Sequence, residues 1–558
     1  MANWDHSVDF LIVGSGSGAM TAALTAYDKG AEPLLIEKSD RYGGSSAMSG
    51  GGLWVPQNHL MEGVGIKDNP EDAWAYLKGT TAGVVPEERL RAYLEHAPQM
   101  VKYLSGHTQV RFVSLPEYAD YYPNVPGSRT GGRCIEPVSF HAGCLGDEFL
   151  NMRAQNPQML IMNRIFMTVF EARTLLTHGS GWIALTMKLM ARYWFDQPWR
   201  LKSKRDRNLA MGNALIGMLR RSLMDRGIPI WLRTPAKELV VEDGRVVGVV
   251  AEKDGRPLRI GASKGVLLAA GGFEGNQAMR EKYLPKPTKV EWSCANKHNT
   301  GDGINMGTAV GAAVDLMDDG WWGPTTVVPG EEHARFLVIE KSLPGSILVN
   351  KRGERFVNEA SAYIDVVNAM YEKNTPKAPS VPAYLVFDST FLKKYPVGPL
   401  LPGGRVPKKF QNYIKKSDNI EGLAAQMGID AAGLRATVTQ FNGYAQTGKD
   451  PDFNRGETVF DRYYGDEKVK PNPCLGPIEK PPFYGLETYP GELGTKGGLK
   501  TDERSRVLTE VGQPIPGLYA TGNCSASAMG RTYPGAGATI GPSMTFGYIA
   551  ARDALLEG

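Results

Sequence analysis

The chain has 558 residues, which is too long for one compact core and predicts roughly three to four structural units. Its 63 lysines and arginines nearly balance 59 aspartates and glutamates, and no extended basic run occurs, so nucleic-acid binding is disfavoured. A hydrophobic fraction of 42% with 22% charged residues is typical of globular rather than disordered proteins. No run of about 18 apolar residues is present, which excludes an ordinary transmembrane helix.

Cysteine and histidine spacing predicts no metal site. The five cysteines are scattered without a CxxC pair, and the eight histidines show no HxxxH-type spacing. The first residues are polar and run directly into an apolar stretch, without the features of a secretory signal. We therefore expect a cytoplasmic protein with reduced thiols.

A glycine-rich turn joins a predicted strand over residues 9–13 to a predicted helix over residues 20–29. Gly14 permits the tight turn, Gly16 lets the backbone approach a pyrophosphate, and Ala19 allows the helix to pack closely on the strand. A glycine-rich turn without a ligand is the alternative. The order of these elements predicts a dinucleotide-binding turn made of Gly14, Ser15, Gly16, Ser17, Gly18 and Ala19.

A carboxylate suited to a ribose follows the next predicted strand, residues 33–36. Glu37 comes 23 residues after Gly14, where a carboxylate can accept both ribose hydroxyl protons. Lys38, beside it, is a further candidate for cofactor contact. These first motifs do not separate FAD from NAD.

A second glycine-rich loop favours FAD. Between Tyr42 and Trp54 the chain has five glycines and three serines, whose N–H groups and hydroxyls can bind a second phosphate and a flavin ring. Residues 517–523 and 535–541 repeat this pattern before a predicted helix over 542–556, whose amino end can stabilise negative charge on a reduced flavin. The candidate cofactor residues in these segments are Gly43, Gly44, Ser45, Ser46, Ser49, Gly50, Gly51, Gly52, Gly522, Asn523, Gly537, Ala538 and Ile540.

Together with residues 267–272, 300–303 and 494–498, these motifs resemble the superfamily of FAD-dependent fumarate reductases and 3-ketosteroid dehydrogenases over nearly the whole chain. The resemblance implies an α/β fold: a Rossmann-like FAD-binding domain of the glutathione-reductase type, split into residues 1–321 and 490–558. An α+β substrate-capping domain is expected over 322–489, with residues 449–472 as a polar surface loop. FAD is expected to bind non-covalently, with further contacts from Ala236, Gly271, Gly272 and Asp302.

Three tyrosine motifs indicate the branch of this superfamily. Fumarate reduction needs cations to clamp two carboxylates, whereas a steroid ketone needs an apolar slot, donors for one carbonyl oxygen and a base. Residues 358–365, 117–123 and 531–537 resemble the NES-x-PY, Y-x-D-Y-H-P and TY-x-G-x-G motifs of 3-ketosteroid Δ1-dehydrogenases, with Tyr122 in place of the histidine. By these motifs the chain is identified as a member of that family.

The resemblance assigns roles to four residues. Tyr363 is expected to remove the 2β proton of a 4-en-3-one steroid, with Tyr121 as its hydrogen-bonded helper. The Tyr533 hydroxyl and the Gly537 amide are expected to bind the C3 oxygen, while the 1α hydride goes to flavin N5 and a 1,4-dien-3-one forms. Buried tyrosines that only pack, with satisfied hydroxyls, are the alternative. An external electron acceptor is implied, and no motif identifies it.

Three other functions stay open at this point. A 3-ketosteroid Δ4-(5α)-dehydrogenase would use the same fold and substrates but introduce the 4,5 double bond. A fumarate reductase is disfavoured by the missing haem motif and by the tyrosine set. The third belongs to another class: a flavin-containing, membrane-bound sterol-binding module without turnover.

Residues 156–207 form a hydrophobic and basic insertion that does not fit the soluble members of this family. Residues 159–170 are apolar and long enough for three helical turns, and five cations follow between Arg200 and Arg207. Between these stretches, one apolar row recurs at helical spacing, made of Trp182, Leu185, Leu189 and Tyr193.

This order of apolar, aromatic and basic groups suits a helix that lies in a lipid interface. A buried helical hairpin with a solvated basic loop is the alternative. Lipid contact would place the protein on the inner face of the cell membrane. The resemblance would then narrow to cholest-4-en-3-one Δ1-dehydrogenase, an enzyme of steroid degradation that acts on sterols with an intact side chain.

Overall fold

The computed structural model describes residues 3–176 and 179–556. Its largest sheet is mainly parallel and has the order β20-β21-β11-β1-β2-β8, with β9 and β10 added beside β11. The strands are β1 (His6–Val13), β2 (Pro33–Ile36), β8 (Ile230–Trp231), β9 (Ala236–Glu242), β10 (Arg245–Lys253), β11 (Arg256–Leu268), β20 (Arg506–Leu508) and β21 (Pro514–Ala520). β1 and β2 are short apolar runs buried almost throughout, which is typical of parallel strands covered on both faces.

The two ends of the chain meet in this sheet. β21, from the carboxyl-terminal part, pairs in parallel with β11, and helix α17 (Ile540–Ala554) packs on helix α1 (Ser17–Asp28). Small residues allow this close approach, because a Cβ on Gly18 would meet the Ser543 carbonyl oxygen at 2.4 Å. The nucleotide-binding unit is therefore discontinuous in sequence, as the glycine motifs at both ends predict.

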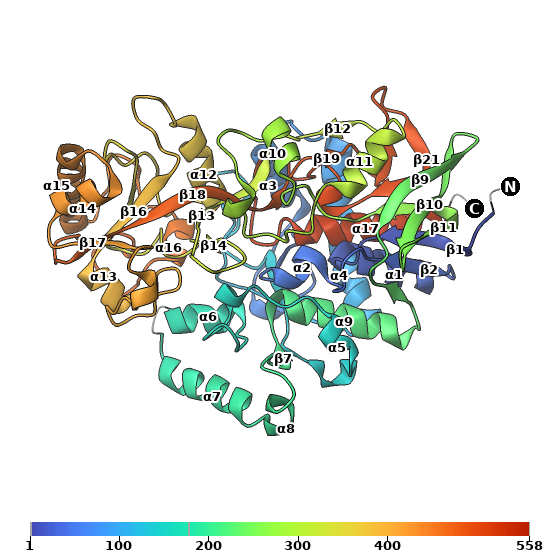
Figure 1. The fold of residues 1–558 in the computed structure, drawn as a ribbon, viewed down its shortest axis with the longest axis horizontal. Coiled ribbons are helices and arrows are strands. Elements are labelled where there is room, and N and C mark those ends of the chain that lie inside the picture. Colours follow the sequence, from blue (N-terminus) through green and yellow to red (C-terminus); the bar gives the residue numbers. More distant parts are fainter. Residues whose placement is uncertain (1–2, 177–178, 557–558) are drawn as a thin grey trace.

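A second sheet of six strands forms the other half of the molecule, on the left of Figure 1. Its order is β14-β13-β18-β16-β15, with β17 beside β18. The strands are β13 (Gly320–Thr326), β14 (Arg335–Phe336), β15 (Ser346–Val349), β16 (Ala383–Asp388), β17 (Lys415–Ser417) and β18 (Phe483–Thr495). Helix α12 (Tyr363–Glu372) packs on β13, and helices α14 (Ile420–Met427) and α15 (Ala431–Thr447) cover a separate apolar cluster beside β15 and β16.

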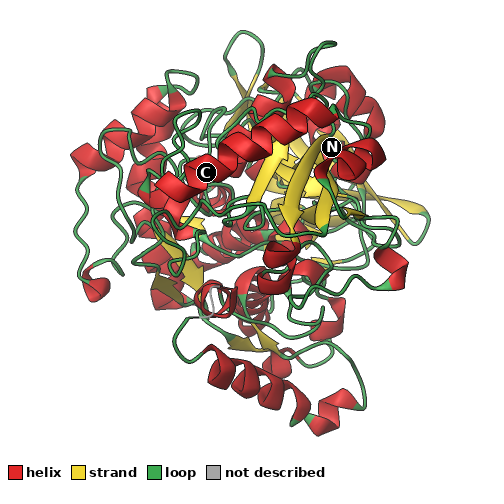
Figure 2. Cartoon of the chain, turned by 90° about the vertical axis from the view of Figure 1, so that its left-hand side faces the viewer, coloured by secondary structure: helices red, strands yellow, loops and turns green. Residues whose placement is uncertain are grey.

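The insertion lies at the lower edge of the molecule in both overall views (Figure 1, Figure 2). It contains the short 3-10 helix η3 (Pro157–Met159), α6 (Val169–Leu176), α7 (Trp182–Trp194) and α8 (Gln197–Arg200). The predicted three helical turns over 159–170 are wrong. Met162 and Asn163 adopt positive φ angles of 52° and 59°, which interrupt any helix there.

Helix α6 begins where a capping box is formed. Thr168 Oγ1 accepts from the Glu171 amide at 3.1 Å, and the Glu171 carboxylate accepts from the Thr168 amide at 2.8 Å. This reciprocal pair satisfies two amide groups that the first turn leaves without partners. The Thr-x-x-Glu spacing was visible in the sequence and would have located the helix correctly.

Both faces of α7 carry apolar side chains. Leu189 and Tyr193 are buried against Ile165, so part of the row at helical spacing packs inward. On the other side Ile183, Met187, Trp194 and Phe195 are exposed. Within residues 3–176 and 179–556, the helices are too short or too polar to cross a bilayer.

The remaining elements connect these units. They are α2 (Gly44–Met48), β3 (Leu53–Trp54), η1 (Glu62–Val64), α3 (Pro70–Thr81), α4 (Glu87–His107), β4 (Phe112–Ser114), β5 (Cys134–Pro137), β6 (Phe140–His141), η2 (Ala142–Leu145), α5 (Glu148–Asn151), β7 (Asn208–Leu209), α9 (Met211–Asp225), α10 (Gln277–Tyr283), η4 (Val290–Trp292), α11 (Asp302–Ala309), β12 (Val314–Asp315), α13 (Ser389–Lys394), η5 (Lys408–Phe410), α16 (Val459–Tyr463), β19 (Gly498–Leu499) and η6 (Gly522–Cys524).

Candidate active site

A cavity of about 550 Å³ runs between the two sheets, and both the glycine motifs and the tyrosine motifs line it. At its nucleotide end, β1 is followed directly by Gly14, whose φ of 114° strongly favours glycine. A Cβ at this position would also meet the Ala269 carbonyl oxygen at 2.3 Å. Helix α1 follows with Gly16 as its N-cap, and Gly16 has no side chain to cap the first amides of the helix. The turn can therefore approach a phosphate closely, as the sequence predicts.

Glu37 lies on the cavity wall just past the end of β2. Its carboxylate accepts from the Ser15 hydroxyl at 2.6 Å and from the Ser39 amide at 2.9 Å. Lys38 pairs with Asp302 at 2.5 Å and donates to Thr300 at 2.7 Å, which joins the first strands to the start of α11. The sequence indicated Lys38 and Asp302 separately, but not that they form a pair.

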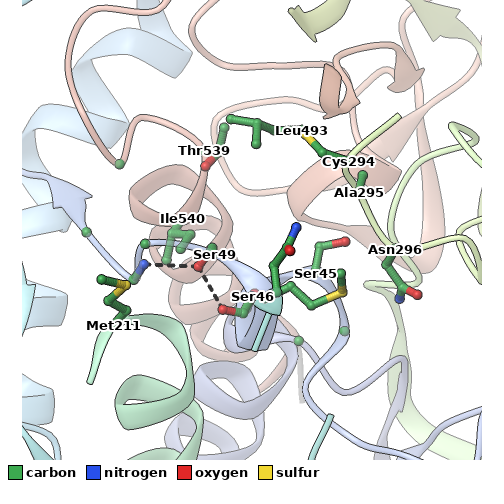
Figure 3. A pocket seen from close by; sticks show the side chains of 18 of the residues that line it. Ser45, Ser46, Ser49, Met211, Cys294, Ala295, Asn296, Leu493, Thr539 and Ile540 are labelled. Atoms are coloured by element: carbon green, nitrogen blue, oxygen red, sulfur yellow. Dashed lines mark hydrogen bonds between the residues drawn. The ribbon is translucent and has the colours of Figure 1, made fainter. Parts of the chain in front are cut away.

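The second glycine-rich loop continues the same wall. Gly51 has a φ of 73°, and a Cβ there would meet the Met211 backbone at 2.4 Å, so only glycine fits. The Ser46 Oγ accepts a hydrogen bond from the Ser17 amide at 3.1 Å. Figure 3 shows Ser45, Ser46 and Ser49 beside the short segment 294–296, around the same space as Thr539 and Ile540. The 294–296 segment lines the cavity without any motif that would have indicated it.

Most of the predicted cofactor residues line this cavity. Four of them do not line it: Ser17, Gly43, Gly272 and Ala538. Those on the wall are Gly14, Ser15, Gly16, Gly18, Ala19, Glu37, Lys38, Gly44, Ser45, Ser46, Ser49, Gly50, Gly51, Gly52, Ala236, Gly271, Asp302, Gly522, Asn523, Gly537 and Ile540.

Three tyrosines from distant segments meet at the other end of the cavity. Tyr363 is the first residue of α12, and its hydroxyl lies 3.1 Å from that of Tyr121. The Tyr363 and Tyr533 rings are 5.3 Å apart and nearly perpendicular, and Tyr121 and Tyr533 are also 5.3 Å apart. Each of the three is at most 5% exposed. The Tyr121 amide donates to the Pro534 carbonyl at 2.9 Å, which fixes two of the three motifs against each other.

Gly537 completes this group. Its φ is 92°, and a Cβ would meet the Gly52 carbonyl oxygen at 2.3 Å, so the two glycine-rich loops touch only because no side chain intervenes. The helix α17 begins three residues later, and its N-cap residue Thr539 makes no side-chain capping bond. Backbone amides at this helix end are available to a ligand in the cavity.

Burial dominates the electrostatics of the phenols. It raises the pKa of Tyr363 well above its usual value, and the nearby Tyr533 adds to the rise. The hydrogen bond from Tyr121 works in the other direction, because it favours the phenolate of Tyr363. Burial also raises the pKa of Tyr533, against hydrogen bonds that involve Tyr363 and Thr539.

The two arginines on the cavity wall are engaged by carboxylates. Arg335 binds Glu331 through two contacts of 2.6 and 2.7 Å. Arg173 pairs with Glu117 and, at 3.1 Å, with Glu467. Paired guanidinium groups are poorly placed to clamp the two carboxylates of a dicarboxylic acid, so this wall does not favour fumarate reduction.

The structure places further aromatic residues at the site, to which the motifs assigned no role. The Tyr118 hydroxyl lies 3.4 Å from that of Tyr121 and bonds to that of Tyr464, and the Phe336 ring packs edge-on against Tyr363 at 5.0 Å. The prediction of a polar surface loop over 449–472 is therefore wrong, because Tyr463 and Tyr464 line the cavity. Aromatic residues within that polar stretch were the available signal.

Tyr122, which stands in place of the histidine of the family motif, has a hydrogen-bond partner in α12. The Tyr122 hydroxyl bonds to an Asp365 carboxylate oxygen at 3.3 Å. Burial raises the pKa of that carboxyl to about 6. Tyr122 thus links the motif of residues 117–123 to α12, two residues after Tyr363.

Comparison with known proteins first defines the class. Residues 9–540 match the FAD-binding domain family, so the chain belongs to that family and FAD is its cofactor. It is 42% identical over 558 residues to 3-oxosteroid 1-dehydrogenase of Mycobacterium tuberculosis, covering 97% of each chain. It is 41% identical over 560 residues to the enzyme of the same name from Mycolicibacterium smegmatis, covering 98% of this chain and 96% of that one.

A solved structure agrees with these relatives. The crystal structure of 3-ketosteroid Δ1-dehydrogenase from Sterolibacterium denitrificans, in complex with 1,4-androstadiene-3,17-dione, matches with a TM-score of 0.97 and 48% identity. The match covers 99% of this chain and 100% of that chain. The protein belongs to the 3-oxosteroid 1-dehydrogenase family and is an FAD-dependent oxidoreductase, which confirms the predicted family, fold class and cofactor.

Proposed function

We propose that the protein converts 3-keto-4-ene steroids to the corresponding 1,4-dien-3-ones by FAD-dependent 1,2-dehydrogenation. The observation that carries this proposal is the meeting of Tyr121, Tyr363 and Tyr533 at one end of a cavity whose other wall is built from FAD-type glycine loops. An apolar cavity with a few convergent hydroxyls suits a ketone with a large hydrocarbon body.

In the proposed chemistry the steroid loses one proton to a tyrosine and one hydride to the cofactor. Tyr363 removes the 2β proton, and Tyr121 stabilises the phenolate that must exist for this step. The Tyr533 hydroxyl and the Gly537 amide donate to the C3 oxygen as negative charge develops there. Each such donor contributes about 3–4 kcal/mol to transition-state stabilisation in comparable sites. Bound FAD supplies the acceptor for the 1α hydride.

The residues on the nucleotide side of the cavity would hold FAD in this scheme. The amides of the first turn and of the second glycine-rich loop bind the phosphates, and Glu37 binds a ribose. Cys294 to Asn296 join them as contacts beyond the motifs. We assign residues 1–321 and 490–558 to FAD binding and 322–489 to the catalytic cap. Strand β13 crosses the border between residues 321 and 322, and strand β18 crosses the border between residues 489 and 490.

The test is product analysis with an artificial electron acceptor. Purified yellow protein is incubated with 4-androstene-3,17-dione, and a 1,4-dien-3-one is the expected product. A 5α-saturated 3-ketone that gains the 4,5 double bond instead would favour the Δ4-(5α)-dehydrogenase alternative. Tight steroid binding without anaerobic bleaching of the flavin would favour a binding module without turnover, and the 1,2-dehydrogenation would then be rejected.

We also propose that the outer face of the insertion contacts the inner surface of the cell membrane. Exposed apolar side chains gather there, and exposed cations stand beside them at Lys188, Lys202 and Lys204. This combination matches helices that lie in anionic lipid interfaces. The apolar members of the set are Phe170, Ile183, Met187, Trp194, Phe195 and Leu201.

Three arginines of the predicted basic loop are engaged by groups of the protein itself. Arg207 pairs with Asp196 at 2.5 Å, Arg205 donates to the Phe149 and Met152 carbonyls, and Arg200 donates to the Lys204 carbonyl. Within this described loop, Lys202 and Lys204 stay exposed and can attract lipid headgroups. Sedimentation with phosphatidylglycerol vesicles should fall when Phe195 and Leu201 are both replaced by Ser. Equal sedimentation of the variant and the wild type would contradict the membrane proposal.

A further inference from the structure

The insertion does more than present an outer surface, because its residues also line the cavity. Residues from its first part and from α6 line the same space as the catalytic tyrosines. The helix α6 contributes through its inner side, whereas Phe170 on its outer side is 65% exposed. The lining residues from the insertion are Asn156, Gln158, Met159, Met167, Val169, Ala172 and Arg173.

Strand β5 connects α6 to the reacting end of the cavity, by which we mean the end where Tyr121, Tyr363 and Tyr533 meet. Cys134 lies beside Gly52, with its Sγ 3.6 Å from where a Cβ of that glycine would stand, and so marks the side of the cavity near Gly537. Two residues farther along the strand, the Glu136 carboxylate accepts from the Val169 amide at 2.9 Å. Two strand residues span about 7 Å. The amino end of α6 is therefore attached to β5 two residues beyond Cys134.

Polar contacts fix α6 to both halves of the molecule. Arg173 binds Glu117, in the same segment as Tyr121, and Glu467, in the cap. Its guanidinium group also lies 4.8 Å from the centre of the Tyr463 ring. Before α6, the Gln158 side-chain oxygen accepts from the Phe336 amide at 2.9 Å. The helix is thus held at its first residue by Glu136 and at its middle by the Arg173 ion pairs, so it forms a defined wall of the cavity.

The inner side of this wall is lined by small apolar side chains. Val169 and Ala172 are three residues apart and therefore share one helix face. Ala172 has no atoms beyond Cβ, so it leaves space where a larger side chain would fill the cavity. Of the residues that follow it, Arg173 pairs with Glu467 outside the helix, and the Thr174 hydroxyl donates to the Phe170 carbonyl of the same helix.

We propose that α6 is the far wall of the steroid slot, and that Val169 and Ala172 determine which substituent at C17 is accepted. This inference rests on the proposed function. With the ketone held by Tyr533 and Gly537, the opposite end of a steroid points away from the reacting end and toward α6. The small residues there fit 4-en-3-one steroids that carry an aliphatic side chain at C17.

The experiment compares two substrates in the holoenzyme variant Ala172→Phe. The ratio of kcat/KM for cholest-4-en-3-one to that for 4-androstene-3,17-dione is expected to fall at least tenfold, because the new ring occupies the space of the side chain. Thr174→Phe is the matched control, since it adds an aromatic ring to the same helix at a position that does not line the cavity. Its ratio should match that of the wild type.

The outcomes separate this inference from the proposed function. If the wild type forms a dienone from neither steroid, the proposed function fails. If it converts both steroids and Ala172→Phe leaves the ratio unchanged, or if it converts only the short one, the assignment of α6 is wrong. Should Ala172→Phe lose FAD during purification, Ala172→Leu is measured in the same way, with a drop of at least threefold as the supporting result and an unchanged ratio as the contrary one.

Discussion

The hydroxyls of Tyr121 and Tyr363 lie 3.1 Å apart, although 242 positions separate the two residues in the chain. Tyr121 comes from a loop of the half that contains the parallel sheet, and Tyr363 begins helix α12, which packs on the second sheet. The hydrogen bond therefore crosses the boundary between the two halves. It is also a contact that favours the phenolate of Tyr363 in surroundings that otherwise oppose it.

Replacing Tyr363 by Phe should remove the proposed base while keeping the fold. We expect kcat for steroid dehydrogenation to fall by about 10²- to 10⁴-fold, the usual contribution of a general base. Tyr384→Phe is the control, because Tyr384 is equally buried but belongs to the separate cap cluster. Flavin absorbance of the purified variants checks that FAD is retained. Activity near the wild-type level in Tyr363→Phe would reject the assignment.

The variant Tyr121→Phe should change the pH dependence instead of abolishing the reaction. The Tyr121 hydroxyl holds the pKa of Tyr363 lower than burial alone would, so its loss raises that pKa further. Only the phenolate can accept the proton, and the rising limb of log kcat against pH should therefore move to higher pH. A pH profile that is lower at every pH but unshifted would argue against this role for Tyr121.

Adding one methyl group at Gly537 should disrupt the junction of the two glycine-rich loops. In Gly537→Ala the new Cβ would meet the Gly52 carbonyl oxygen at 2.3 Å, in addition to the strain of a positive φ. Gly512→Ala is the matched control, since its φ of 78° is similar but nothing lies within 4 Å of the added carbon. The positive φ alone costs about 1–2 kcal/mol.

We therefore expect Gly537→Ala to lose bound FAD or at least a hundredfold in kcat/KM, and Gly512→Ala to lose only a few degrees in Tm. The FAD to protein ratio and the melting curve measure the two effects. If both variants behave alike, the contact with Gly52 has no special importance.

The buried carboxyl of Asp365 should make stability depend on pH. Its pKa is raised from 3.8 to about 6, chiefly by burial, so the folded state holds its proton more tightly than the unfolded state. The stabilisation is fully present below pH 4 and is lost as the pH rises through 6. The difference of about two pKa units corresponds to roughly 3 kcal/mol.

Asp365→Asn has no carboxyl to ionise, so its stability does not fall as the pH rises through 6. Its amide oxygen can still accept a hydrogen bond from Tyr122. The free energy of unfolding of the variant, relative to the wild type, should increase between pH 4 and pH 6 in urea titrations. Asp418→Asn, at an exposed position, serves as the control and should show no such trend. A flat difference for Asp365→Asn would mean that the carboxyl titrates normally in the folded protein.

The local chemistry of this protein could be predicted from its sequence. The turn at Gly14 follows from a short strand, a glycine pattern and a helix that are contiguous in the chain, and Glu37 follows at a fixed spacing. The tyrosine motifs were recognised because each is a short segment that resembles a motif of a known family. Family, fold class and cofactor followed from these segments.

Tertiary structure decided which of these segments meet and what else joins them. Tyr464 is held at the cavity by Tyr118, 346 positions away, and the Phe336 ring packs on Tyr363 of a different element, which no local pattern encodes. The same holds for the insertion, where apolar residues on α7 divide between an inner cluster and an outer face. A sequence shows that a side chain is apolar, but only its neighbours in space determine whether it faces protein, substrate or solvent.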